Sequence, residues 1–275
     1  MQKIAYLGPE NSYSFLAAKT VAGKDDVLVA LPSFSEVLEN VRNGGADVAV
    51  VPIENSIEGN VNEVTDGLIL GGTSLYINAE FVLTIDNYLI ALDGADFSKI
   101  ETVVSHWQPL GQCRQTVKKI LPNAKIVFAD STSAALGRVT DTKTAAIGGK
   151  QLVRKGLQKS NGPVNDVPDN HTRFLVLSKN DSQKPENDKL TIVFEAENKP
   201  GGLLKLLEFF NGFKINMTRL ESRPHKSALG RYIFVADIMG NISDKNTLSA
   251  LELIKKHTIF YKYLGGYKEN VSPLS

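Results

Sequence analysis

The sequence contains one cysteine, Cys113, and no apolar stretch long enough to cross a membrane. A single cysteine cannot form an internal disulfide, so we expect a reducing compartment and a small core residue at this position. The first nine residues have the pattern of a short strand and a turn, without the long apolar segment of a signal peptide. Together these features predict a cytoplasmic protein with no membrane partner.

An excess of positive charge is also missing, since 31 Lys and Arg residues stand against 30 Asp and Glu residues. This balance argues against nucleic acid as a partner. The sequence has no paired-cysteine motif, no histidine cluster and no dense group of carboxylates, so we expect no metal site. Gly148 and Gly149 follow a predicted strand, but their spacing is not that of a dinucleotide-binding loop, and we expect no nicotinamide cofactor.

What is present, through the first 180 residues, is an alternation of apolar strands and amphipathic helices, the pattern of a mainly parallel α/β sheet. We expect two α/β lobes with a cleft between them, lobe one formed by about residues 1–75 and 157–180 and lobe two by about 76–156. The predicted strands are 4–7, 27–31, 46–51, 88–92, 102–104, 126–129, 144–147 and 173–177, and the predicted helices are 13–21, 34–43, one opened by Pro109 and one from Ser131.

The pattern changes after a polar stretch rich in Asn, Asp, Lys and Pro. Strands at 190–197, 215–221, 231–239 and 260–264 and helices at 203–210 and 244–257 give the order βαββαβ, which is the ferredoxin-like arrangement. We therefore expect an α/β domain at 1–180, a linker at 181–188 and a small α+β module at 189–275.

Polar side chains gather where the predicted strands end. Ligands of open α/β sheets bind beyond the carboxyl ends of the strands, and helix N-termini at the same rim favour small anions. The amides and hydroxyls there, with Arg173 as a nearby cation, predict a mostly uncharged pocket for a small molecule that carries a carboxylate. On these grounds an enzyme and a binding protein are equally good interpretations. The polar residues are Asn55, Ser56, Ser105, Gln108, Gln112, Asn170 and Thr172.

Several segments, in chain order, resemble the signature motifs of the prephenate dehydratase family. In the α/β domain they are Gly8-Pro9-Glu10-Asn11-Ser12-Tyr13-Ser14, Ile53-Glu54-Asn55-Ser56 with Glu58-Gly59, Ser105-His106 with Gln108 and Gln112-Cys113, Ser131-Thr132 with Ala134-Ala135, and Thr172-Arg173-Phe174. The C-terminal module resembles the ACT regulatory domain of that family at Pro200-Gly201-Gly202-Leu203-Leu204 and Glu221-Ser222-Arg223-Pro224. The resemblance implies a two-lobed, periplasmic-binding-protein-like catalytic domain followed by a ferredoxin-like ACT domain.

Three positions depart from the family pattern. Asn11-Ser12 stands in place of Gly-Thr, Trp107 in place of a proline, and Gly202 where the effector-sensing loop usually has Ala. Ser12 keeps a hydroxyl, so the first change reshapes the pocket rim without removing a donor. The change at Gly202 bears on effector affinity more than on catalysis.

The resemblance implies conversion of prephenate to phenylpyruvate with loss of carbon dioxide and water, without a cofactor, and inhibition by L-phenylalanine. Thr172 is placed at the departing hydroxyl. Because the pKa of an alcohol is too high for a general acid, we interpret it as a hydrogen-bond donor or a relay. The residues implied to bind substrate are Asn55, Ser56, Ser105, Gln112, Arg173, Phe174 and Ser12, and those implied to bind the effector are Asn198, Gly201, Gly202, Leu203, Leu204, Glu221, Ser222, Arg223 and Pro224.

Alternatives stay open at this point. In a regular strand, Thr172 and Phe174 share one face while Arg173 points the other way, so Arg173 either pairs with the pyruvyl carboxylate or makes a structural ion pair. An arogenate dehydratase and a non-catalytic small-molecule sensor are the competing functions. A lone ferredoxin-like module leaves sheet edges and one face uncovered, so we expect a homodimer or a homotetramer.

Overall fold

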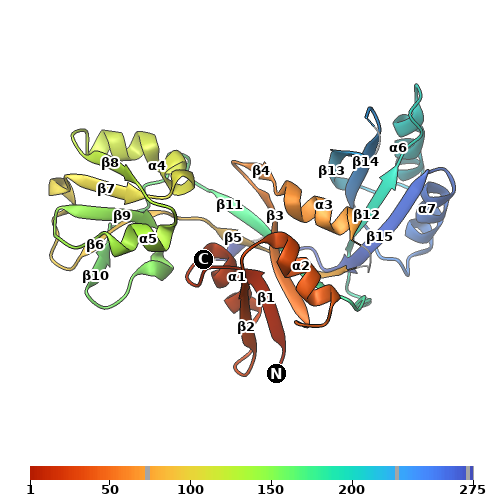
Figure 1. Ribbon diagram of the computed structural model, residues 1–275. Coiled ribbons are helices and arrows are strands. Elements are labelled where there is room, and N and C mark those ends of the chain that lie inside the picture. Colours follow the sequence, from red (N-terminus) through yellow and green to blue (C-terminus); the bar gives the residue numbers. More distant parts are fainter. Residues whose placement is uncertain (72–74, 227–228, 271–272, 275) are drawn as a thin grey trace.

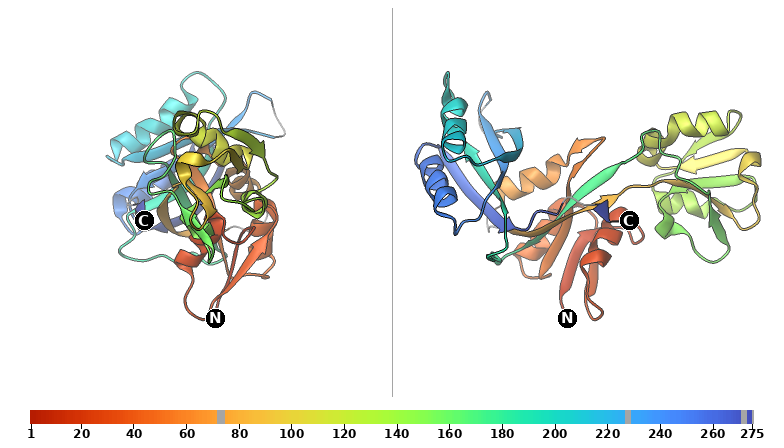
Figure 2. Two further views of the ribbon diagram at one scale, coloured as in Figure 1. Left: turned by 90° about the vertical axis from the view of Figure 1, so that its left-hand side faces the viewer. Right: turned by 180° about the vertical axis from the view of Figure 1, so that it is seen from behind.

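The computed structural model describes residues 1–71, 75–226, 229–270 and 273–274. It shows two α/β lobes and a C-terminal α+β domain side by side, with the first lobe in the middle (Figure 1). Two segments, one between β5 and β6 and one between β10 and β11, connect the lobes (Figure 2). Within the described residues, no helix is both long and apolar enough to span a bilayer.

The first lobe is a mixed sheet with strand order β16-β5-β11-β3-β1-β2, and β4 pairs with β3. β3 is apolar along most of its length and buried, as expected of a central strand covered on both faces. Side-chain oxygens of Ser12 and Ser33 cap α1 and α2. The elements are β1 (Lys3–Leu7), α1 (Tyr13–Val21), β2 (Val27–Leu31), α2 (Phe34–Arg42), β3 (Val48–Asn55), β4 (Gly59–Asn60), α3 (Asn62–Leu70), β5 (Tyr76–Thr84), β11 (His171–Ser178) and β16 (Pro273–Leu274).

The second lobe is a sheet of order β10-β6-β9-β7-β8. Its core includes Cys113, which is fully buried on α4, as the sequence predicts. The helix begins at Trp107, two residues before the predicted start, because a proline in the first turn loses no intrahelical hydrogen bond. The elements are β6 (Tyr88–Leu92), η1 (Phe97–Lys99), β7 (Thr102–Ser105), α4 (Trp107–Ile120), β8 (Lys125–Phe128), α5 (Thr132–Gly137), β9 (Thr144–Gly148), η2 (Lys150–Leu152) and β10 (Leu157–Lys159).

Two of the expected lobe boundaries are wrong. Residues 76–84, expected in lobe two, form β5, which pairs with β11 in the sheet of lobe one. Residues 157–159, expected in lobe one, form β10, which pairs with β6 in lobe two. Both strands pair with strands far away in the sequence, and the local residue pattern does not predict such pairing.

The C-terminal domain has the predicted order βαββαβ, and its sheet has the strand order β13-β14-β12-β15. One face packs against α6 and α7. The other face packs against lobe one, where Ile233, Val235 and Tyr267 share a core with Leu175 and Ile77. Each such burial contributes about 1.5–3 kcal/mol, so the domain is docked firmly on the sheet of lobe one. The elements are β12 (Lys189–Glu195), α6 (Gly202–Gly212), β13 (Met217–Pro224), β14 (Tyr232–Met239), α7 (Lys245–Lys256) and β15 (Phe260–Tyr267).

Candidate active site

A cavity of about 640 Å³ lies between the two lobes. Lobe one contributes the β1–α1 turn, the loop from Asn55 to Val61, and Thr172 and Phe174 on β11. Lobe two contributes the start of α4, the residues around the start of α5 and those that follow β9. This is the position predicted for a ligand, beyond the strand ends of an open sheet.

Asn55 holds the hydroxyl of Thr172 in a defined orientation. The side-chain oxygen of Asn55 accepts hydrogen bonds from the backbone N–H groups of Ile57 and Glu58, at 2.9 Å each. Because backbone N–H groups can only donate, this contact fixes which end of the amide is the nitrogen. Nδ2 then donates to Oγ1 of Thr172 at 2.9 Å and to Oδ1 of Asn170 at 2.7 Å. Thr172 is thus an acceptor toward Asn55, and its own O–H hydrogen is left for the cavity.

A chain of polar side chains crosses the cavity from one lobe to the other. Gln112 on α4 accepts a hydrogen bond from Nδ2 of Asn170 at 3.2 Å. Its own Nε2 donates to the Glu58 carboxylate at 2.7 Å, and Nε2 of Gln108 donates to the other oxygen of that carboxylate at the same distance. Glu58 therefore ties lobe one to the first turns of α4. In the sequence Glu58 stands out only as part of a motif, and nothing in its local pattern points to this bridge.

The cavity offers neutral donors rather than cations. None of the described residues that line it is Lys or Arg. The lining includes the carboxyl groups of Glu58 and Asp130, and the groups there that attract an anion are helix N-termini: Ser12 caps α1, accepting from the N–H of Phe15 at 3.1 Å, and α4 begins at the rim without a side-chain cap. Such backbone groups bind anions without a formal charge.

One wall of the cavity is apolar. Phe174 stacks on Phe81 with ring centroids 5.7 Å apart. Tyr13 also lines the cavity, and its hydroxyl donates to the backbone carbonyl of Asp86. Burial, with a further contribution from Asp86, raises the pKa of Tyr13, so this hydroxyl stays protonated at neutral pH. A flat, apolar ring with a small polar group fits such a wall.

Three of the residues expected to bind substrate do not line the cavity. Ser105 is fully buried, and its hydroxyl donates to the backbone carbonyl of Ile147 at 3.5 Å. The hydroxyl of Ser56 accepts from the N–H of His171 at 2.9 Å and so braces the loop that carries Asn55. The third is Arg173.

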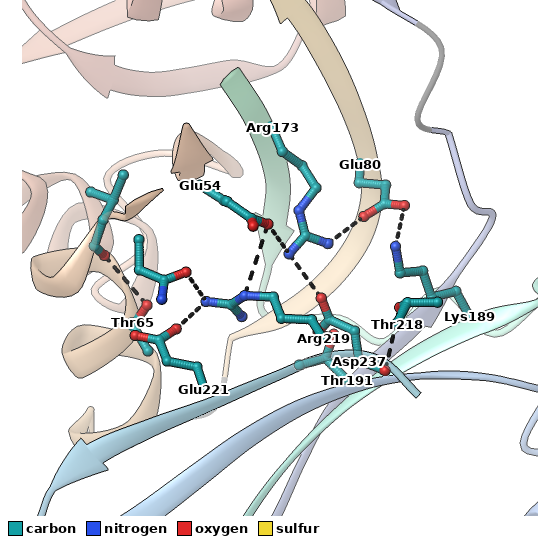
Figure 3. Close-up of polar contacts among 12 residues, drawn as sticks. Glu54, Thr65, Glu80, Arg173, Lys189, Thr191, Thr218, Arg219, Glu221 and Asp237 are labelled. Carbon is teal, nitrogen blue, oxygen red and sulfur yellow. Dashed lines mark hydrogen bonds and ion pairs between the residues drawn. The ribbon is translucent and has the colours of Figure 1, made fainter. Parts of the chain in front are cut away.

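Arg173 points away from the cavity, as strand alternation predicts. Its guanidinium lies on the opposite face of β11 from Thr172 and forms ion pairs with Glu80 at 3.0 Å and Asp237 at 2.8 Å (Figure 3). Of the two interpretations of Arg173, this placement supports the structural ion pair. The pairing of β11 with β3 shifts register between Arg173 and Phe174, a bulge of the kind that re-aims side chains beside active sites.

Comparison with known proteins decides the family. The model of the prephenate dehydratase family matches residues 4–182, which is well over half of the chain, and that of the ACT domain matches residues 190–252. The chain belongs to the prephenate dehydratase family. It is accordingly a prephenate dehydratase, a carbon–oxygen lyase of phenylalanine biosynthesis with a C-terminal ACT domain, rather than a non-catalytic sensor.

Individual relatives agree with this assignment. The chain is 34% identical over 275 residues to the prephenate dehydratase of Amycolatopsis methanolica, covering 97% of this chain and 88% of that protein. It is 36% identical to the bifunctional chorismate mutase/prephenate dehydratase of Escherichia coli K12, covering 99% of this chain and 72% of that protein. The crystal structure of prephenate dehydratase from Arthrobacter aurescens in complex with L-Phe matches with a TM-score of 0.86 and 33% identity, over 97% of this chain and 90% of that one.

The expected effector residues of the ACT domain fall into two groups. Asn198 to Gly201 end the turn between β12 and α6, and Gly202 to Leu204 begin the helix, with Gly201 at φ of +79° directly before it. A Cβ at Gly202 would lie 2.1 Å from the backbone oxygen of Glu197, so an alanine at this position does not fit the backbone as it stands. The second group, Glu221 to Pro224, lies on β13.

Alternate residues of β13 face the prephenate dehydratase domain. Arg219, Glu221 and Arg223 are shielded to different degrees, whereas Leu220 and Ser222 are exposed. Arg223 donates to Asp66 on α3 at 2.8 Å. The strand expected to bind the effector is therefore also a contact strand between the domains.

Proposed function

We propose that the cavity binds prephenate with its leaving hydroxyl at Thr172 and its ring against the wall formed by Phe174. The bond to the ring carboxylate breaks, its electron pair enters the ring, and the bond to the hydroxyl breaks as the ring becomes aromatic. The hydroxide takes up a proton that comes from solvent and leaves as water. Thr172 stabilises the departing oxygen through the hydrogen that Asn55 leaves free, while Gln112 and Asn55 order the polar groups around it.

The observation that carries this proposal is the fixed orientation of Asn55 beside Thr172. The test is incubation of the purified protein with prephenate, with arogenate as a second arm, and detection of phenylpyruvate or phenylalanine at neutral pH. Turnover of prephenate is expected. Absence of phenylpyruvate from the prephenate arm would contradict the proposal, and phenylalanine from the arogenate arm alone would replace prephenate by arogenate as the substrate.

The amide of Asn55 provides a sharper test. In an Asn55→Asp variant an oxygen would face Oγ1 of Thr172 and take its hydrogen, so we expect kcat to fall by about tenfold or more. Asn11→Asp is the control, because it adds the same charge to the cavity rim without a contact to Thr172. Equal losses in the two variants would assign the effect to charge alone and remove Asn55 from the proposed role.

We also propose that L-phenylalanine binds the ACT domain at the turn before α6 and on β13, in a homodimer or homotetramer, and favours an inactive state of the cleft. The related structure with bound L-Phe supports this proposal. Linkage requires the effect to be reciprocal.

The reciprocity is measurable by calorimetry. A non-reactive substrate analogue is expected to weaken the binding of L-phenylalanine by about 5- to 150-fold, the usual range of such coupling. Equal affinity with and without the analogue would rule out the proposed inhibition through two states.

A further inference from the structure

Arg173 connects the catalytic strand β11 to the ACT sheet. Its guanidinium contacts Asp237 on β14 of the ACT domain at 2.8 Å, Glu80 on β5 at 3.0 Å and Glu54 on β3 at 3.3 Å (Figure 3). Lys189 on β12 completes the group with a contact to Glu80 at 2.9 Å. Arg173 is 9% exposed, and the cavity at this interface has a volume of only about 10 Å³, so no ligand fits there.

The same interface holds the loop of the active site. Arg219 on β13 donates to Asn60 at 3.0 Å and lies 4.0 Å from Glu54. Glu54 and Asn60 flank the loop that carries Asn55 and Glu58, so one ACT side chain contacts both ends of that loop. Arg223, farther along β13, is bound to α3, which follows the loop directly.

The charged residues of this interface form a network in which the charges are closely paired but not every hydrogen-bonding group has a partner. The network consists of Glu54, Glu80, Arg173, Lys189, Arg219 and Asp237. Burial raises the pKa of Asp237, but the attraction of Arg173 and Arg219 together with the hydrogen bond from Thr191 outweighs burial and leaves that pKa below its usual value. The Nε atoms of Arg173 and Arg219, however, are buried without a hydrogen-bond partner. Orphaned buried N–H groups are costly, so an arrangement of the same charges that paired these groups would recover part of that cost.

Stability alone does not explain these charges. Hydrophobic residues of similar volume in place of a buried ion pair are often neutral or stabilising, so a charged interface of this kind is better suited to specificity than to strength. Its position is informative: Arg173 follows Thr172 directly in β11, and Glu54 precedes Asn55 in β3. A shift of the ACT sheet would reach both proposed active-site residues through one side chain.

We propose that Arg173 is a positioning residue, and that the contacts from Asp237 and Arg219 to Arg173 and Glu54 carry the state of the ACT domain to Thr172 and Asn55. This inference rests on the proposed function and adds the route of its regulation. The second arrangement that such coupling requires is one in which the Nε groups of Arg173 and Arg219 are paired, and the state of the ACT domain selects between it and the arrangement in the structure.

Asp237→Asn tests the route, because it keeps the shape and an acceptor for Arg173 but removes the charge. We expect kcat to fall by roughly three- to thirtyfold with little change in KM. The dissociation constant of L-phenylalanine in the absence of substrate should stay within about twofold of the wild-type value. The inhibition of kcat by L-phenylalanine, in contrast, should largely disappear.

The matched control is Glu195→Gln. Glu195 is as buried as Asp237 and also pairs with an arginine, Arg231 at 2.6 Å, but that pair lies entirely within the ACT domain. The control should retain wild-type kcat. Equal changes in both variants, or wild-type kcat and inhibition in Asp237→Asn, would overturn the inference.

A second variant keeps the test decisive if Asp237→Asn does not fold. The Glu54 side chain is 44% exposed and tolerates change more readily, and Glu54→Gln weakens its contacts to Arg173 and Arg219. The same loss of inhibition is expected, and unchanged inhibition would again overturn the inference. Wild-type protein that fails to turn over prephenate refutes the proposed function instead, so the two failures are distinguishable.

Discussion

Replacement of Thr172 by alanine is expected to lower kcat by about 10²- to 10³-fold, the usual loss when one donor to a developing negative charge is removed. KM should change by only a few fold, because the hydroxyl acts on the departing oxygen rather than on the groups that anchor the substrate. Steady-state rates of phenylpyruvate formation measure both constants.

Thr172→Ser is the control for this prediction, because it keeps the hydroxyl that Asn55 orients. We expect it to retain most of the activity, and a thermal melt of each variant shows whether the fold is intact. Near-normal turnover by a folded Thr172→Ala variant would remove the residue from the mechanism.

A Gly265→Ala substitution is expected to lower the stability of the protein strongly. A Cβ at Gly265 would lie 2.5 Å from the backbone oxygen of Ile77 and 2.8 Å from its nitrogen, where β15 of the ACT domain crosses β5 of the first lobe. Gly265 also has φ of +120°, which strains any other residue. Overpacking and strain each cost about 1–3 kcal/mol, so we expect a loss of about 3 kcal/mol or more.

Gly266 provides the matched comparison one position along. A Cβ there meets the Tyr263 hydroxyl at 3.0 Å, which is a side chain that can move, and the backbone angle is ordinary. For a chain of this size, 1 kcal/mol corresponds to roughly 2–4 °C in Tm. We therefore expect scanning calorimetry to show a drop of about 6–12 °C for Gly265→Ala and a much smaller one for Gly266→Ala. Similar values would mean that the two backbones do not approach as closely as described.

The elements with strong local signals are predictable from the sequence. The helix α1 and the strand β2 have the predicted bounds, and the βαββαβ order of the ACT domain is confirmed. Apolar runs, caps and glycine stops determine these segments locally, so the sequence by itself is enough to predict them.

The segments that the sequence analysis leaves unassigned are those that hold the domains together. α3 contains Gly67 and lacks a side-chain cap, so its helix propensity is poor. It forms because Val64 and Leu68 are buried and because Lys262 of the ACT domain donates to the carbonyl oxygen of Leu68 at 2.8 Å. β5 likewise exists through its long-range pairing with β11. Neither the contacts of α3 nor the pairing of β5 can be predicted from the neighbouring residues in the sequence.

The active site was predictable in its motifs but not in its connections. Period-two alternation correctly separates Thr172 from Arg173, whereas the partners of Arg173 lie on β5 and β14, far away in the sequence. The same is true of Glu58, which reaches Gln112 across the cavity. Side chains that act between elements become visible only when the elements are placed in space.

A crystal structure with a stable analogue of prephenate tests the central claim most directly. The oxygen that represents the leaving hydroxyl should lie about 2.6–3.2 Å from Oγ1 of Thr172, with Asn55 still donating to that same Oγ1. An analogue bound in the cavity with its hydroxyl turned away from Thr172, and held by other groups, would contradict the proposed role of the threonine.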